Sequence, residues 1–125
     1  MQIIFKRLDH VQICIPVGEE AAARKFYSDT LGLTEIEKPV QLRANGGLWY
    51  QIGDVQLHIG AEAQINKSKR HPAFEILAAE DVRNYLQEKG VRTQDEIQLP
   101  GLYRFSFFDP FNNRIELLEY KPAAI

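Results

Sequence analysis

Apolar and polar residues alternate along several short stretches of the chain, with the two-residue period of a half-buried strand. The first stretch, residues 8–16 (LDHVQICIP), is also rich in β-branched residues, which favour strands. Residues 19–31 (EEAAARKFYSDTL) predict a helix, because they are good helix formers with an acidic start and Gly32 just after the end. Gly53 and Asp54 predict a tight turn that joins two neighbouring strands into a hairpin. Further short strands are expected near residues 33–38, 47–53 and 54–60.

The same order of elements recurs in the second half of the chain. Residues 61–70 are polar and lack apolar periodicity, which indicates a connecting loop. Residues 71–77 (HPAFEIL) predict a strand, and residues 81–90 (DVRNYLQEKG) predict a helix with an acidic start and a glycine stop. Three more strands are expected, at residues 91–98, 102–108 and 113–120. The pattern predicts an α+β fold, a single domain over 1–125 made of two βαβββ modules, about 5–60 and 71–120.

Strand parity separates an apolar face from a polar face, since successive side chains point to opposite sides. The apolar face should pack under the two helices. The polar face carries all three histidines of the chain and one glutamate at matching places in the two modules. Its polar members include His10, Gln12, Gln56, His58, His71, Glu75, Arg114 and Glu116. The simpler alternative is that this face only meets water, but such a face is usually dominated by Lys, Glu and Thr.

Composition and charge exclude several other classes of protein. Apolar residues make up 45% and charged residues 26% of the 125 residues, which is ordinary for a globular domain. The net charge of −2 gives no reason to expect nucleic acid or an anionic membrane as a partner. The sequence MQIIFKRLDH at the N-terminus does not read as a signal peptide, and no apolar run is long enough to span a bilayer. The single cysteine, Cys14, suits a cytoplasmic location.

Two imidazoles and one carboxylate can bind a divalent ion and leave coordination positions open for water or substrate. Such an ion polarises a carbonyl oxygen, binds a phosphonate or activates dioxygen, depending on the metal and the pocket. A single histidine taken alone is more often a surface or core residue than a ligand. Histidines and a carboxylate at pseudo-symmetric positions favour a metal site.

Four segments carry a family resemblance: LDHVQICI (8–15), ARKFYSDTLGL (23–33), HPAFEI (71–76) and FFDPFNNRIELLEY (107–120). Together they resemble the glyoxalase/bleomycin-resistance/dioxygenase group, the vicinal oxygen chelate superfamily. The resemblance implies two βαβββ modules that form an open, curled mixed β-sheet, a cup with the helices outside. One difference is Asn112, where the group usually has glycine. Asparagine tolerates the left-handed conformation, so the turn should persist.

The resemblance also implies a metal site. Its ligand positions correspond to His10, His71 and Glu116, which would hold one divalent ion (Fe, Mn, Ni, Co or Zn). Some relatives use Glu or Gln in the fourth strand, where this chain has His58. This histidine is therefore a fourth ligand, a proton-transfer group or a pocket wall, and we take His58 and Glu116 as the catalytic candidates.

Five other residues are candidate substrate contacts. For Trp49 an aromatic wall and ordinary core packing are equally good interpretations. Arg104 could meet an anionic group or face solvent. The candidates are Gln12, Trp49, Gln56, Arg104 and Arg114.

The leading hypothesis is a metal-dependent enzyme acting on a small, oxygen-rich substrate. Isomerase or lyase, thiol-transferase and extradiol dioxygenase chemistries share the same implied ligands, so the ligands do not separate them. The alternative is a metal-free protein that binds a small molecule or drug, as bleomycin-resistance members do. The resemblance further implies a homodimer. The sequence does not specify the substrate or the metal. It leaves open whether one chain or two complete the cup.

Overall fold

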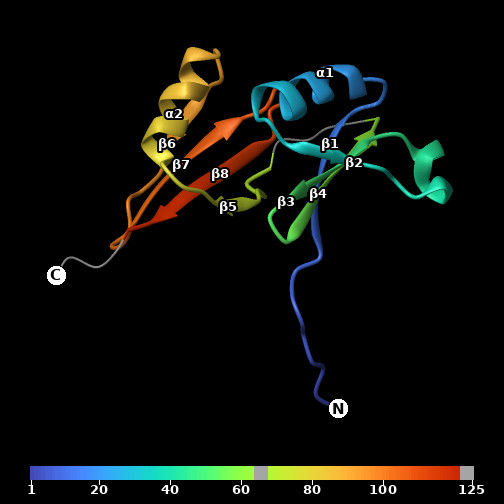
Figure 1. Ribbon diagram of the computed structural model, residues 1–125, viewed down its shortest axis with the longest axis horizontal. Helices are drawn as coiled ribbons and strands as arrows, with labels where there is room; N and C mark the ends of the chain where they lie inside the picture. The colour runs from blue at the N-terminus through green and yellow to red at the C-terminus, as the bar shows by residue number, and fades with distance from the viewer. Residues whose placement is uncertain (64–67, 122–125) are drawn as a thin grey trace. The chain divides into compact units, whose positions relative to one another are not determined.

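The computed structural model describes residues 1–63 and 68–121 (Figure 1). The chain divides into two compact units, Met1–Ile65 and Asn66–Ile125. Each unit contains one open four-stranded sheet with a helix over one of its faces (Figure 1). In the described ranges, no helix is both long enough and apolar enough to cross a membrane.

The first unit has its sheet in the order β1-β4-β3-β2. Strand β1 runs parallel to β4, and the other neighbours are antiparallel. A short 3-10 helix, η2, lies between β2 and β3, where the sequence pattern had predicted no element. The elements are β1 (His10–Pro16), α1 (Glu20–Arg24), the π-helical η1 (Lys25–Thr30), β2 (Thr34–Ile36), η2 (Val40–Asn45), β3 (Leu48–Ile52) and β4 (Val55–Glu62).

The second unit repeats this topology, with the order β5-β8-β7-β6 and a parallel pair formed by β5 and β8. Its elements are β5 (Ala73–Glu75), α2 (Ala79–Glu88), β6 (Thr93–Asp95), β7 (Leu102–Phe108) and β8 (Arg114–Tyr120). The registers correspond as well, since Gln12 is opposite His58 and Ala73 is opposite Glu116. The predicted α+β fold with a repeated βαβββ order is therefore confirmed.

The apolar face of each sheet packs against the helix of its own unit, as strand parity had predicted. In the first unit Ile15 and Tyr50 on the sheet and Tyr27 on the helical segment are fully buried. In the second unit Phe105 on β7 and Leu86 on α2 are buried in the same way. Burying these large side chains supplies the main stabilisation of each unit and leaves the opposite face of each sheet for polar residues.

Some predicted boundaries are wrong. The fifth strand covers only Ala73–Glu75, so His71 lies before it rather than in it. Pro72 has no backbone N–H, which prevents regular pairing from starting earlier, although its carbonyl accepts the Glu116 N–H at 3.0 Å. The predicted loop at 61–70 is also shorter, because β4 extends to Glu62. Residues 64–67 of that loop lie outside the described residues.

Two positions show how special backbone conformations shape the fold. Asn112 has φ of 68°, the left-handed conformation expected there, in the turn between β7 and β8. Gly47 has φ of 86°, and a Cβ at this position would lie 2.1 Å from the carbonyl oxygen of Ile59. Glycine at position 47 therefore lets the segment after η2 lie directly against β4, which positions η2.

Candidate functional site

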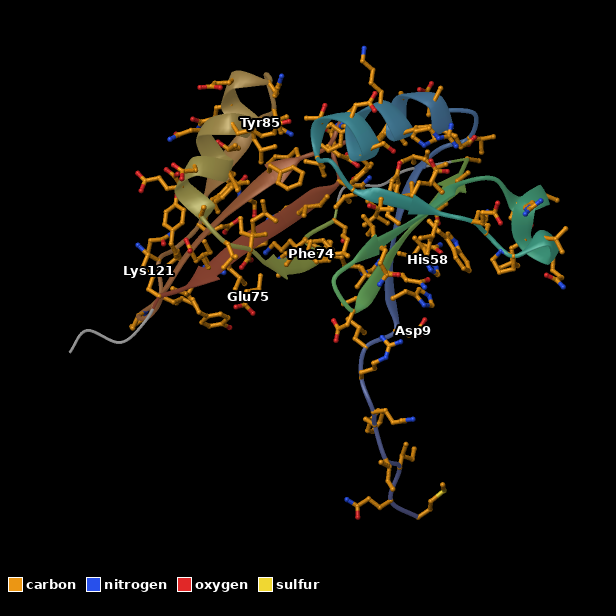
Figure 2. All side chains as sticks on the ribbon, viewed as in Figure 1. Asp9, His58, Phe74, Glu75, Tyr85 and Lys121 are labelled. Atoms are coloured by element: carbon orange, nitrogen blue, oxygen red, sulfur yellow. The ribbon has the colours of Figure 1, made fainter. Side chains whose placement is uncertain are left out.

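The polar face of the first unit holds a stack of three rings. The imidazole of His58 on β4 lies between His10 on β1 and Trp49 on β3. The ring centroids of His58 and His10 are 4.0 Å apart at 14°, and those of His58 and Trp49 are 3.8 Å apart at 4°. The pairing of β3 with β4 places Trp49 directly opposite His58. His58 lies on the side of this sheet away from α1 (Figure 2).

Hydrogen bonds fix the tautomer of both histidines. His10 Nδ1 lies 2.8 Å from Asp9 Oδ2, and His58 Nε2 lies 2.9 Å from Gln56 Oε1. A carboxylate or an amide oxygen can only accept, so these two ring nitrogens carry the hydrogen. The lone pair is then on Nε2 of His10 and on Nδ1 of His58, where each could bind a metal ion or receive a proton.

The electrostatic surroundings keep His58 neutral at pH 7. Burial lowers the pKa of this imidazole below its usual 6.5. The charge of Lys38, and that of His10 whenever it is protonated, lower it further, against the opposing effect of Asp9. The pKa of Asp9 is lowered as well, chiefly by its hydrogen bond to His10. The stack thus places a neutral imidazole with an available Nδ1 on the polar face.

A cleft of about 510 Å³ lies over this stack and is lined entirely by the first unit. Lys38 and the η2 segment form one wall, and the Lys38 ammonium donates a hydrogen bond to the Gly46 carbonyl. At the base, a Cβ at Gly60 would lie 2.8 Å from Nε2 of Gln12, so the glycine leaves room for that amide. The polar and aromatic lining comprises His10, Gln12, Lys38, Trp49, Gln56 and His58.

The polar face of the second unit brings His71 and Glu116 together. His71 Nδ1 donates to the Lys69 carbonyl at 2.7 Å, and Nε2 lies 3.3 Å from Glu116 Oε1. The Glu116 side chain is only 7% exposed. With Nδ1 committed as a donor, Nε2 of a neutral His71 would face the carboxylate as a second acceptor. A positive charge beside both atoms makes this contact favourable.

Arg104 supplies a positive group to Glu116. Its Nη1 lies 3.3 Å from Oε1 and 3.5 Å from Oε2 of that carboxylate, and its Nε donates to the Ile97 carbonyl at 2.8 Å. The guanidinium is therefore held on the sheet face and does not extend into solvent. It already occupies both oxygens of the Glu116 carboxylate.

A separate network on the same face involves Arg114. Its guanidinium donates to Glu96 and also to Ser106 Oγ at 3.3 Å, while Ser106 donates to Glu96 at 2.7 Å. Burial disfavours ionisation of Glu96, but the hydrogen bonds from Ser106 and Arg114 and the charge of Arg114 outweigh it and lower the pKa of this carboxyl. Arg114 is thus occupied by Glu96.

The candidate residues that the sequence suggested lie in two separate groups, one in each unit. His10, Gln12, Trp49, Gln56 and His58 line the cleft of the first unit, and His71, Arg104 and Glu116 form one contact network in the second. Across the described ranges, no three His, Cys, Asp or Glu side chains are grouped as a metal ion would require.

Sequence reasoning missed several residues of these faces. Asp9 and Lys38 line the cleft, and Glu96 and Ser106 bind Arg114. A signal for the wall of the cleft was available, since Lys38 precedes a proline and the glycine pair 46–47 marks a turn. No local pattern indicated Glu96, because its partner lies 18 residues away.

Comparisons with known proteins identify the fold group. The model of the Glyoxalase/Bleomycin resistance protein/Dioxygenase superfamily matches residues 7–117. A solved protein from Bacillus anthracis, assigned to the glyoxalase family, is 42% identical with a TM-score of 0.90, covering 97% of this chain and 100% of that one. A glyoxalase family protein from Enterococcus faecalis is 27% identical, with a TM-score of 0.71 and coverage of 92% and 98%.

A third solved structure shares the fold alone. TnmS3, an antibiotic binding protein from Streptomyces sp. CB03234, is 19% identical with a TM-score of 0.72, covering 96% of this chain and 100% of that one. No curated protein matches the chain.

Proposed function

Because this chain belongs to the Glyoxalase/Bleomycin resistance protein/Dioxygenase superfamily, we propose that it is a divalent-metal-dependent enzyme acting on a small, oxygen-rich molecule. In this proposal His71 and Glu116 supply two ligands to one ion and His10 supplies the third. The reaction would be of the isomerase or lyase, thiol-transferase or dioxygenase type.

The observation that carries the proposal is the contact between His71 and Glu116. The Lys69 carbonyl holds the Nδ1–H of His71, the arrangement that leaves Nε2 of a metal-binding histidine unprotonated. That nitrogen faces a buried carboxylate oxygen at 3.3 Å, so two groups that can bind a divalent ion lie side by side. Among the other donors, His10 also carries its hydrogen on Nδ1, toward Asp9, and has its Nε2 lone pair available. The chemistry of the donor set therefore suits a divalent ion.

When bound, the ion would supply Lewis-acid polarisation of a substrate oxygen. The chain's own residues would bind the substrate and move protons. Gln56 holds His58 in the tautomer that exposes Nδ1, and the stack with Trp49 fixes the plane of the ring. His58 is thus the candidate for accepting a proton, because it is neutral and its orientation is fixed. Gln12 and Gln56 offer amide groups to polar substituents.

A metal-free binding protein is the second candidate. It is supported by Arg104, which already neutralises Glu116, and by a cleft that the first unit lines alone. TnmS3 is described as an antibiotic binding protein, so a protein of this fold binds a small organic molecule. In this case the imidazoles and amides would bind an organic ligand directly.

Measurement of metal binding separates the two candidates. Wild-type protein is freed of metal with chelator and titrated calorimetrically with Mn²⁺, Fe²⁺, Co²⁺, Ni²⁺ and Zn²⁺, beside Glu116→Gln, His71→Ala and His10→Ala. The matched control is Glu75→Gln, which removes an exposed carboxylate from β5 (Figure 2). About one ion per chain, lost in the three ligand variants and kept in the control, supports the enzyme.

Failure of wild-type protein to bind any of the five ions refutes the metal-dependent function and leaves the binding protein. Retention of full affinity in His10→Ala would remove that residue from the ligand set. The homodimer and the cytoplasmic location stay predictions, and light scattering of the purified chain would test the first.

A further inference from the structure

We propose that the cleft of the first unit binds a small organic carboxylate, with Lys38 as the residue that receives the negative charge. This inference names the substrate class of the proposed function and rests on it in one respect, that the bound acid is the substrate. Lys38 was not among the candidates that the sequence suggested.

The charges on the lining of the cleft favour an anion. Asp9 is the acidic group there, and it is already hydrogen bonded to His10 and paired with Arg7 at 3.4 Å. Among the described residues, no carboxylate lies within ion-pair distance of Lys38. A cation without a carboxylate partner on the wall of a cleft adds a positive contribution to the potential inside it.

Lys38 is held where a ligand could meet it. Its ammonium donates to the Gly46 carbonyl, while Arg43 Nε donates to the Lys38 carbonyl at 3.3 Å. These contacts fix both ends of the residue against the η2 segment. An ammonium group has three hydrogens, so two remain for a ligand after the bond to Gly46. Lys38 and the three stacked rings line the same cleft, so its charge acts on the space that a ligand over the stack would occupy.

The rest of the lining suits the uncharged part of such an acid. Trp49 and His58 present aromatic rings, and Leu42 and Ile59 add apolar surface. The amide of Gln12 offers both a donor and an acceptor. A volume of about 510 Å³ is within the usual range for small-molecule sites. The cleft therefore combines one fixed cation with a mixed aromatic and amide surface, a combination that selects organic acids over neutral analogues.

Benzoate and benzamide provide a matched pair of probes, because they share a ring and differ in charge. Trp49 is the single tryptophan of the chain, so a ¹⁵N-labelled sample gives one indole N–H signal that reports directly on the cleft. The full chain is titrated with each probe twice. The first titration is done on metal-free protein in the presence of a chelator, and the second on protein loaded with the ion that it binds. Benzoate is expected to shift the indole signal saturably and to bind about tenfold more tightly than benzamide, the effect of one charge-assisted hydrogen bond.

Two variants assign the charge to its residue. Lys38→Gln should weaken the affinity for benzoate by about tenfold and leave the affinity for benzamide unchanged. Lys25→Met, a change of an exposed lysine on η1, should alter neither affinity. Equal binding of the two probes, no saturable shift with either, or full benzoate affinity in Lys38→Gln would overturn the inference. If Lys38→Gln loses its dispersed spectrum, the comparison of the probes on wild-type protein decides.

The chelator arm separates this inference from the proposed function. Charge-selective binding in chelator supports the carboxylate site even when no metal binds. Metal binding by wild-type protein without charge selectivity would overturn the inference and leave the metal site standing.

Discussion

Replacing Arg104 with glutamine should increase the affinity of the chain for a divalent ion. The guanidinium contacts both oxygens of Glu116, at 3.3 and 3.5 Å, and is held there by the Ile97 carbonyl. Glu116 is the carboxylate ligand in the proposed site, so an ion must either displace Arg104 or bind beside it. Both alternatives cost free energy that the variant would not require.

The contact distances give the expected magnitude. A hydrogen bond between charged groups contributes about 1.5–3 kcal/mol, and the two here are longer than the roughly 2.7–2.9 Å of strong ones. The lower part of that range, about 1.5 kcal/mol, corresponds to about tenfold in the dissociation constant. If Arg104 stayed in place, repulsion between its charge and the ion would add to this figure. We therefore expect Arg104→Gln to bind the ion about tenfold more tightly.

Calorimetric titration at fixed pH and ionic strength measures the change, with competition against a fluorescent chelator where binding is tight. Arg114→Gln is the matched control, because that arginine lies on the same sheet face and pairs with Glu96 instead of Glu116. Its affinity should stay near the wild-type value. Metal-free Arg104→Gln should also melt at a lower temperature, since Glu116 loses a charged partner, and should regain stability when the ion is added.

The reasoning would be refuted if Arg104→Gln bound the ion no more tightly than wild type. A weaker affinity would mean that the guanidinium orients the carboxylate for the metal instead of competing with it. Glu116→Gln should abolish the gain in the Arg104→Gln background; a gain that persisted there would place the ion on other ligands.

Two further predictions concern stability. The pKa of Glu96 is lower in the folded protein than its usual value of 4.5. Ionised Glu96 therefore contributes its full stabilisation at pH values above 4.5, and this contribution is lost as the pH falls through the folded pKa. Glu96→Gln should therefore lower the free energy of unfolding at pH 7 but lose less stability than wild type between about pH 5 and pH 3. Urea unfolding measured across this pH range gives both values. An equal loss of unfolding free energy in the two proteins would argue against the network with Arg114. Gly47→Ala should cost about 2–4 kcal/mol, since φ is 86° and the new Cβ would meet the Ile59 carbonyl oxygen. Gly53→Ala, with φ of 54° and open space around it, should cost only about 1 kcal/mol, and equal losses in urea melts would contradict this account.

The backbone pattern and the division into faces could be predicted from the sequence, because both depend on local periodicity. Alternation alone placed Ile13 and Ile15 in the core and His10 on the polar face, as observed. The order of elements predicted two βαβββ modules, and both are observed. The conformation of Asn112 followed from its own side chain. In each case the deciding residues are neighbours along the chain.

Cross-strand register and distant side chains decided the rest. The start of α2 at Ala79, earlier than expected, is stabilised by Glu119, whose carboxylate accepts the backbone N–H groups of Ala78 and Ala79 at 3.1 Å from 40 or so residues away. For Trp49 the sequence left an aromatic wall and ordinary core packing equally good, and Tyr50 is its neighbour along the chain. The pairing of β3 with β4 places Trp49 opposite His58, and Tyr50 is buried in the core.

The candidate site shows the same division. The sequence determined which residue types could bind a metal or a substrate, because imidazole, carboxylate and amide chemistry belongs to the side chain itself. Only the tertiary structure decided that Arg104 neutralises Glu116, that Arg114 is held by Glu96, and that Lys38 reaches the cleft. A charged group acts on whatever lies within a few ångströms, and those neighbours are set by strand register and loop packing, which no local pattern encodes.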